Sequence, residues 1–413
     1  MIEFDIVIIG AGPAGVTAGT YLLKQGLDVL VIEKAKFPRF VIGESLLPRC
    51  MDIFEEVGLL PYLEKQNYQL KKGVIFRRNG EESIFDFSEQ FTQGKPYTWH
   101  VPRAHFDNVL AESAQDMGLM IEFETALEDI ALHDNHQTLT LSNKDGEQKI
   151  IRSKFVIDSS GYGRVLPRLL NLNDDSQLPV RTTIFSHFRD KRREEFKDES
   201  NYILYLVHDK HYIWNIPFAD GRTSIGFVGE NEVFDEIEGD IANKYDELVK
   251  GEPYLLDRYG SQEILFSPRM LKGFSVGVKQ LYGEGYALTG NATEFLDPIF
   301  SSGVTVAAES GLLAAKLASK QLAGEQVDWA EEYEKPIRFG IEVFKTYVSA
   351  WYDKSLQTIF FSKNQSPEMR RQICSILAGY VWDETNPCVN RYQTILDTLC
   401  KVIEIQGNTN VDQ

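Results

Sequence analysis

The hydrophobic pattern at the start of the chain predicts a β-α-β unit. Residues 4–9 (FDIVII) form a short apolar run followed directly by a glycine, which is typical of a buried parallel strand. Residues 13–25 follow with apolar positions at helical spacing, and residues 28–33 (DVLVIE) form a second buried run. Two parallel strands joined by one helix indicate a mixed α/β fold.

Later hydrophobic runs predict a second sheet and a helical end. Apolar and polar residues alternate through much of 182–229, with a turn signal at Asp220-Gly221, and this pattern favours antiparallel strands. Residues 285–290 (GYALTG) are expected to return to the first sheet. The alanine-rich segment Gly303–Gly324 predicts a helix, and the chain beyond it is expected to be mostly helical.

Composition narrows the classes of partner. Hydrophobic residues make up 43% of the 413 residues, enough for a sizeable core, and the net charge is −18. Such an acidic chain is unsuited to nucleic acid or to an anionic membrane surface. The sequence has no run of 18 apolar residues, no basic signal segment at its start and no metal-ligand spacing among its four cysteines. We therefore expect a cytoplasmic protein with reduced thiols, no membrane span and no metal site.

A glycine-rich turn follows the first strand and opens the first helix. Gly10 permits the tight turn, Gly12 allows the backbone to approach a pyrophosphate, and Gly15 allows the helix to pack against the strand. Glu33 ends the second strand, where a carboxylate can hold the ribose of an adenosine. Strand, turn, helix and terminal acid together predict a dinucleotide site.

Two further segments favour FAD over NAD. Residues 155–161 (FVIDSSG) and 285–291 (GYALTGN) resemble the second and third fingerprints of para-hydroxybenzoate-hydroxylase-like flavoproteins. Asn291 stands where that family usually has an aspartate for the ribityl chain, and its amide oxygen can still accept a hydrogen bond. The cofactor is therefore expected to be non-covalent FAD.

Four motifs resemble those of the flavin-dependent halogenases. They are residues 37–48 (FPRFVIGESLLP), the Val101-x-Arg103-x-x-Phe106-Asp107 pattern, residues 212–217 (YIWNIP) and residues 295–303 (FLDPIFSSG). The chain is similar to this halogenase-like branch over roughly residues 1–320, and geranylgeranyl reductases and monooxygenases are more distant relatives of the same kind.

The resemblance and the nucleotide motifs together imply a set of cofactor contacts. The predicted FAD-binding residues are Gly10, Gly12, Pro13, Ala14, Gly15, Glu33, Lys34, Arg39, Ser45, Arg103, Asp158, Gly161, Asn291, Pro298 and Gly303. Where the helix opens, the backbone N–H groups of Ser302 and Gly303 predict an anion site for chloride or for negative charge on the flavin. The alternative is an ordinary helix cap by Ser301 or Ser302.

Two side chains are catalytic candidates by the same resemblance. Lys71 stands where halogenases have the lysine that delivers hypochlorous acid, and the alternative is a surface lysine like its neighbour Lys72. Trp214 is expected to separate flavin from substrate, and the alternative is a core aromatic residue. Tyr212 replaces the first tryptophan of the family signature, and Phe300 replaces the glutamate of tryptophan halogenases, so a tryptophan substrate is not expected.

The predicted fold class is α/β, with an FAD-binding Rossmann-like (GR2-type) three-layer domain and an interleaved antiparallel-sheet substrate domain. The FAD-binding domain is assigned residues 1–80, 98–180 and 275–325. The substrate domain is assigned 81–97 and 181–274, and a helical C-terminal region is assigned 326–413.

The predicted function is that of an FAD-dependent, halogenase-like oxidoreductase that uses reduced flavin and O2 on a phenol- or pyrrole-type aromatic. The substrate is either free or bound to a carrier protein. Because no second GxGxxG follows a strand, reduced flavin is expected from a separate flavin reductase. The alternatives are an aromatic monooxygenase, a flavin enzyme that reduces prenyl C=C bonds, and a non-enzymatic flavin-binding redox sensor.

Overall fold

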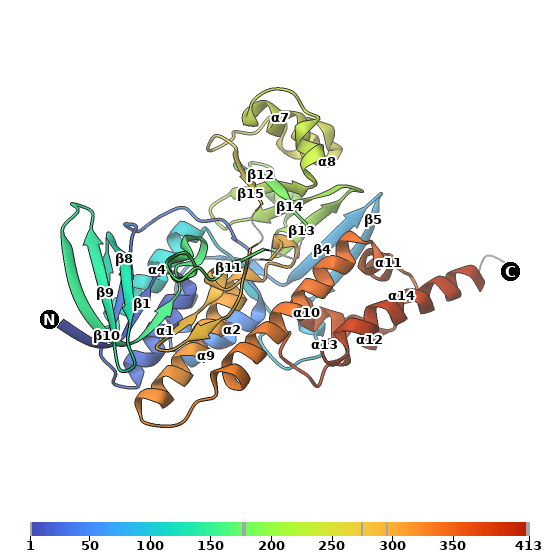
Figure 1. Cartoon of the computed structure of the whole chain (residues 1–413). Coiled ribbons are helices and arrows are strands. Elements are labelled where there is room, and N and C mark those ends of the chain that lie inside the picture. Colours follow the sequence, from blue (N-terminus) through green and yellow to red (C-terminus); the bar gives the residue numbers. More distant parts are fainter. Residues whose placement is uncertain (1, 176–178, 274–275, 295, 410–413) are drawn as a thin grey trace.

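The structure is a computed structural model of the whole chain, and it describes residues 2–175, 179–273, 276–294 and 296–409. Phe295 of the FLDPIFSSG motif lies outside the described residues. Figure 1 shows the two chain ends on opposite sides of the molecule, with one large sheet near the N-terminus and a second large sheet beyond it.

The first sheet contains the predicted β-α-β unit at its centre. In the described part of the chain its strands run in the order β18-β19-β10-β1-β2-β7, while β9 pairs with β10 and β8 pairs with β9. Their bounds are β1 (Ile2–Ile9), β2 (Val29–Glu33), β7 (Met120–Phe123), β8 (Thr125–Leu132), β9 (Gln137–Asn143), β10 (Gln148–Asp158), β18 (Tyr282–Gly283) and β19 (Tyr286–Leu288). Strand β1 pairs in parallel with β2 and β10, and β19 pairs in parallel with β10, so the predicted return to this sheet is confirmed.

Helix α1 (Pro13–Lys24) joins β1 to β2 and packs against the long helix α9 (Gly303–Leu322). The contact is unusually close, since a Cβ atom on Gly311 of α9 would lie 2.5 Å from the carbonyl oxygen of Ala14. Glycine therefore allows two helices from distant parts of the sequence to start side by side at the same edge of the sheet.

The second sheet has the order β16-β12-β15-β14-β13-β4-β5 in the described part of the chain. Its strands are β4 (Gly73–Arg78), β5 (Glu81–Asp86), β12 (Thr182–Arg189), β13 (Tyr202–Val207), β14 (His211–Pro217), β15 (Arg222–Gly229) and β16 (Arg269–Lys272). All neighbours are antiparallel except β13 and β4. The predicted turn at Asp220-Gly221 joins β14 to β15, and Gly221 has a φ of +81°.

One predicted domain boundary is wrong. Residues 1–80 were assigned to the FAD-binding domain, yet β4 begins at Gly73 and pairs with β13 and β5 in the second sheet. The apolar run in β4 fits a buried strand of either sheet, and only long-range pairing decides which sheet it joins. The division of the remaining chain into domains stays a prediction.

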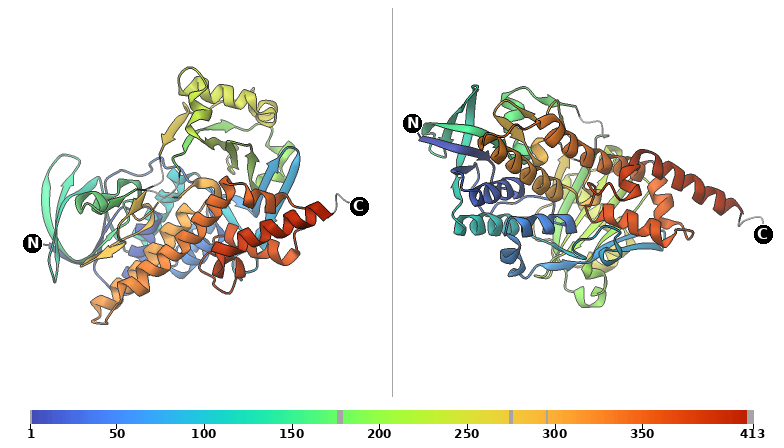
Figure 2. Two further views of the ribbon diagram at one scale, coloured as in Figure 1. Left: turned by 45° about the vertical axis from the view of Figure 1, so that its right-hand side comes forward. Right: turned by 90° about the horizontal axis from the view of Figure 1, so that it is seen from below.

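Helices cover both sheets and form the C-terminal region, so the mixed α/β class with a helical end is confirmed. The other helices include α2 (Pro48–Glu56), α3 (Leu60–Glu64), α4 (Arg103–Asp116), α5 (Val165–Leu169), α6 (Asn231–Asp235), α7 (Ile241–Gly251), α8 (Pro253–Tyr259), α10 (Lys335–Tyr352), α11 (Ser355–Phe361), α12 (Pro367–Leu377), α13 (Pro387–Asn390) and α14 (Tyr392–Thr409). Figure 2 shows the helices from α9 onward, in orange to red, following one another toward the C-terminus.

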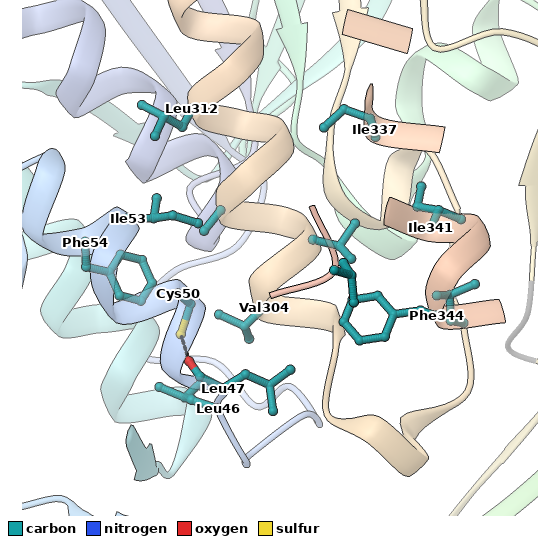
Figure 3. Close-up of a cluster of buried hydrophobic side chains, with 14 of the residues drawn as sticks. Leu46, Leu47, Cys50, Ile53, Phe54, Val304, Leu312, Ile337, Ile341 and Phe344 are labelled. Carbon is teal, nitrogen blue, oxygen red and sulfur yellow. Dashed lines mark hydrogen bonds between the residues drawn. The ribbon is translucent and has the colours of Figure 1, made fainter. Parts of the chain in front are cut away.

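A buried apolar cluster holds α10 of the C-terminal region against α2 and α9. Figure 3 shows side chains of α2, α9 and α10 packed together, among them Ile53, Val304 and Phe344. The thiol of Cys50 lies in the same cluster and donates to the carbonyl oxygen of Leu47. Among the helices that the structure describes, none is long and apolar enough to cross a membrane.

Candidate active site

A cavity of about 340 Å³ lies between the two sheets. Its lining includes the glycine-rich turn after β1, the end of β2, the segment 41–45, strands β13 and β14, and the start of α9. Two helix N-termini, those of α1 and α9, therefore face one cavity, which favours a ligand with negative charge at two places.

The start of α1 is open for a phosphate group. Gly10 has a φ of +101°, and a Cβ atom there would lie 2.6 Å from the carbonyl oxygen of Ser159. The N-cap residue Gly12 supplies no side-chain cap, so first-turn N–H groups of α1 stay available to a ligand. A Cβ atom on Gly12 would lie 3.6 Å from the Arg39 guanidinium, and so would project into the space between that cation and the helix.

Two arginines at this end share one buried carboxylate. Asp107 of α4 accepts hydrogen bonds from Arg39 Nη1 at 2.9 Å and from Arg103 Nε at 2.8 Å. Arg103 also donates to the carbonyl oxygens of Ile42 and Gly43. One carboxylate against two guanidiniums leaves a net positive charge beside the start of α1, as a pyrophosphate requires.

The carboxylate of Glu33 lies at the end of β2, as predicted. Its Oε2 accepts from the Ala11 backbone at 3.0 Å and its Oε1 accepts from the Ala35 backbone at 2.9 Å. Each oxygen keeps a further lone pair, and both Glu33 and Lys34 line the cavity. This end of the cavity is suited to the hydroxyl groups of a ribose.

The start of α9 lies at another part of the cavity lining. Its N-cap residue is Ser302, and no side chain caps the helix, so the ordinary helix-cap alternative is not observed. Ser301 adopts a left-handed conformation, with a φ of +55°, and turns the chain into the helix. Ser302 and Gly303 both line the cavity. An uncapped helix start of this kind can accept an anion, and the anion site at Ser302 and Gly303 stays a prediction.

The second sheet supplies the apolar wall of the cavity. Side chains alternate along β13 and β14, so that Ile203, Tyr205, Trp214 and Ile216 all line the cavity. Trp214 Nε1 donates to Ser224 Oγ at 3.1 Å. The ring lies flat over the neighbouring strand, because only a glycine, Gly226, leaves room for it: a Cβ atom there would lie 2.2 Å from the ring.

Lys71 lies outside this cavity lining and is 1% exposed. It ends β3 (Gln69–Lys71), which pairs with β6 (Thr98–His100). Its Nζ donates to the carbonyl oxygen of Leu46 at 2.8 Å and lies 5.4 Å from the centre of the Phe87 ring. Burial lowers the pKa of Lys71 from 10.5 to about 7, against a smaller opposing effect of Cys50. The surface-lysine alternative is therefore wrong for Lys71, and the solvent-facing side chain is that of Lys72.

Most of the predicted cofactor residues come together here. Those that line the cavity are Gly10, Gly12, Pro13, Ala14, Glu33, Lys34, Arg39, Ser45, Arg103, Gly161, Asn291, Pro298, Ser302 and Gly303. Gly15 and Asp158 do not line it. A Cβ atom on Gly15 would lie 1.9 Å from the Gly10 carbonyl oxygen, and the Asp158 carboxylate accepts from the backbones of Ser160 and Leu166. Both residues shape the turns that surround the cavity.

The sequence prediction missed a tyrosine–aspartate–tyrosine cluster. Asp297 lines the cavity, and its two oxygens accept from Tyr212 at 2.7 Å and from Tyr352 at 2.6 Å. The replacement of tryptophan by Tyr212 was the available signal, since a phenol needs a hydrogen-bond partner when it is buried. Tyr352, at the end of α10, carried no such signal.

A second missed pair is Glu44 and His187. Both side chains are buried, and Glu44 Oε1 lies 3.0 Å from His187 Nε2. Glu44 lines the cavity, whereas His187 comes from β12 and contacts the rings of Phe218 and Phe266. This pair joins the segment 41–45 to the second sheet.

The comparisons with known proteins agree with this site. Residues 3–212, about half of the chain, match the family described as FAD binding domain. The chain belongs to this family of flavoproteins, and the residues around the cavity fit FAD: cations and an uncapped helix for the pyrophosphate, a carboxylate for the ribose and a second uncapped helix at the far end.

Within the family the chain is halogenase-like. It is 29% identical over 410 residues to the 1H-pyrrole-2-carbonyl-(peptidyl-carrier protein) chlorinase of Pseudomonas fluorescens, covering 92% of this chain and 90% of that protein. A solved flavin-dependent brominase superposes with a TM-score of 0.84 at 25% identity, covering 98% and 100% of the two chains. A flavoprotein/dehydrogenase from Cytophaga hutchinsonii superposes with a TM-score of 0.96 at 45% identity, covering 98% and 100%. The predicted cofactor, enzyme class and halogenase-like branch are confirmed.

Proposed function

We propose that this chain is a flavin-dependent halogenase that acts on an electron-rich aromatic of the pyrrole or phenol type. Bound reduced FAD would supply two electrons that reduce O2 to the peroxide level, and this activated oxygen would then oxidise the halide by two electrons. The residues of the chain itself hold the cofactor, bind the halide, keep the substrate away from the flavin and direct the oxidant.

The observation that carries the proposal is the separation of Lys71 from the flavin cavity. Trp214 and Ser45 line the cavity, whereas Lys71 is buried behind the backbone of Leu46, to which it donates. No carboxylate pairs with Lys71 among the described residues. A buried amine without a counter-ion reduces stability, and such groups are typical of reactive sites.

The halide end of the proposal rests on the start of α9. The backbone N–H groups of Ser302 and Gly303 have no side-chain competitor, so they can hold a chloride or bromide ion beside the flavin. Ser45 lines the cavity, and the next residue along the chain, Leu46, accepts the hydrogen bond from Lys71. We propose that an oxidant formed from the halide travels from the cavity to the amine of Lys71.

The aromatic substrate is proposed from Phe300 and from the relatives. Phe300 is buried against Trp351, with ring centres 6.5 Å apart, and supplies no carboxylate to an indole N–H. The Pseudomonas relative chlorinates a pyrrole group attached to a peptidyl carrier protein. We propose the same general class here, a pyrrole or phenol presented either free or on a carrier, with reduced flavin delivered by a separate reductase.

The test uses the FAD-loaded chain with a flavin reductase, NADH, O2 and either chloride or bromide. Pyrrole-2-carboxylate, its carrier-bound thioester and simple phenols serve as the panel, and mass spectrometry detects halogenated products. Lys71→Ala should lower product formation by about 10²–10³-fold, because a positioned charge-stabilising donor is lost. The flavin should still be oxidised by O2 at close to the wild-type rate.

The matched control is Lys72→Ala, which removes the neighbouring exposed lysine and should leave the halogenated product unchanged. A hydroxylated product that forms without halide and survives Lys71→Ala would replace the proposal by an aromatic monooxygenase. Oxidation or reduction of a prenyl C=C bond without O2 would replace it by a dehydrogenase, the description given to the Cytophaga protein.

A further inference from the structure

Three buried polar atoms near Lys71 have no hydrogen-bond partner among the described residues. They are Ser45 Oγ, Thr98 Oγ1 and His100 Nε2. The backbones that carry them are adjacent, because Lys71 pairs with Thr98 across β3 and β6 and a β-bridge joins Ser45 to His100. The group therefore forms one buried polar patch beside Lys71, hereafter the Lys71 patch, and Ser45 is its member that also lines the flavin cavity.

The orientation of the His100 ring fixes which nitrogen carries its proton. His100 Nδ1 lies 3.1 Å from the carbonyl oxygen of Pro217, and a carbonyl oxygen can only accept. Nδ1 is therefore the N–H donor in this contact. In the neutral ring the other nitrogen, Nε2, then has a bare lone pair and no proton.

The surroundings keep the ring neutral. Burial is the largest cause, and the charges of Lys71 and Arg193 add to it, so the pKa of His100 lies well below its ordinary value despite the Pro217 contact. The side chain is 0% exposed. An acceptor that is buried without a partner costs about 1–3 kcal/mol, and a buried polar atom left in this way calls for a ligand.

We propose that His100 Nε2 accepts a hydrogen bond from the ring N–H or the phenolic O–H of the aromatic substrate, and that it orients the ring at Lys71. The identity of the ligand as an aromatic substrate rests on the proposed function. The site selects donors: a pyrrole or a phenol satisfies the lone pair of Nε2, whereas a furan of the same shape leaves it unpaired.

The neighbours of the Lys71 patch are consistent with a role for His100 in orienting the substrate. Pro217 belongs to the YIWNIP segment, so the same strand that carries Trp214 into the flavin cavity also holds the ring of His100. Phe87 contacts Lys71, with its ring centre 5.4 Å from Nζ. The amine of Lys71 and the imidazole acceptor of His100 therefore belong to one patch.

The experiment measures binding directly, and its result does not depend on turnover. The FAD-loaded protein is titrated with pyrrole-2-carboxamide and with furan-2-carboxamide, which differ at the ring N–H, by isothermal calorimetry. The wild type should bind the pyrrole about tenfold or more tightly than the furan. His100→Phe should remove this preference, and His100→Gln, whose amide oxygen can accept, should restore part of it.

His105→Phe is the matched control, since His105 is an exposed histidine five residues further along, and it should keep the preference. Flavin absorbance checks that every variant retains FAD. The wild-type titrations alone can overturn the proposal: they would do so if the two probes bound with equal affinity or if neither probe bound. If the protein prefers the pyrrole probe but forms no halogenated product, the proposed function is wrong and the His100 site is supported. If it forms halogenated product but binds the two probes equally, the proposed function is supported and the His100 site is wrong.

Discussion

Replacing Lys71 by methionine is expected to change how the stability of the protein depends on pH. Burial lowers the pKa of this amine from 10.5 in the unfolded chain to about 7 in the folded chain. Between these values the unfolded chain carries a proton here that the folded chain does not, so the wild type gains stability as the pH rises. The loss of stability caused by burying the charged amine is at its maximum below about pH 7 and disappears as the pH approaches the unfolded pKa of 10.5.

The size of the effect follows from how steeply the free energy of unfolding changes with pH. One proton difference is worth about 1.4 kcal/mol per pH unit, so the free energy of unfolding should rise by about 2 kcal/mol between about pH 7.5 and 9.5 from this group alone. Methionine does not titrate and lacks this contribution. It also leaves the Leu46 carbonyl oxygen without its donor, but that cost is the same at every pH.

The assay is urea unfolding of the FAD-saturated protein at several pH values in this range, followed by intrinsic fluorescence. The difference in the free energy of unfolding between wild type and Lys71→Met should change steadily with pH. Lys72→Met, which alters the exposed neighbour, should follow the wild type. Parallel curves for wild type and Lys71→Met would refute the argument that burial lowers the pKa of Lys71.

Three further substitutions test the cavity. Gly15→Ala should lower the FAD content measured by flavin absorbance, because its Cβ would lie 1.9 Å from a carbonyl oxygen of the glycine-rich turn and overpacking of this kind costs about 1–3 kcal/mol; full wild-type FAD content would contradict this. Gly226→Ala places a methyl group 2.2 Å from the Trp214 ring and should push that ring into the cavity, weakening FAD binding by about tenfold or more in a fluorescence titration; an unchanged affinity would show that the ring can move elsewhere. Tyr212→Phe removes a donor from buried Asp297, at a cost of about 1.5–3 kcal/mol. Burial already raises the pKa of this carboxyl, and removing a donor to its ionised form should raise that pKa further. Thermal melts should therefore show a loss of stability that grows as the pH rises, and a loss that is the same at every pH would count against this reasoning.

Features encoded by neighbouring residues could be predicted from the sequence. The β-α-β unit, the glycine-rich turn and Glu33 at the end of β2 all depend on short-range spacing, and the structure has them as expected. The start of α9 was predictable for the same reason. These motifs can be recognised in the sequence because each requires a particular backbone conformation or a particular donor at a fixed offset along the chain.

Features that depend on long-range pairing could not be predicted. Lys71 and Lys72 are the same residue type on neighbouring positions, and strand alternation says only that one of them points inward. Pairing of β3 with β6 decides that it is Lys71. The contact of Glu44 with His187 likewise joins positions 143 residues apart, and nothing local distinguishes that histidine.

The three-residue contact around Asp297 also changes what the tyrosine at position 212 signifies. Tyr212 of β14 and Tyr352 of α10 each donate to a different oxygen of one carboxylate, and the Ile299 backbone also donates to the oxygen that Tyr212 contacts. Loss of either tyrosine therefore removes one donor from that carboxylate. The substitution is therefore one part of a linked set and not an isolated departure from the family signature. In a collection of relatives, a tyrosine at the first position of the signature should occur together with a tyrosine at the end of this helix, and a tryptophan there should release the second site to vary.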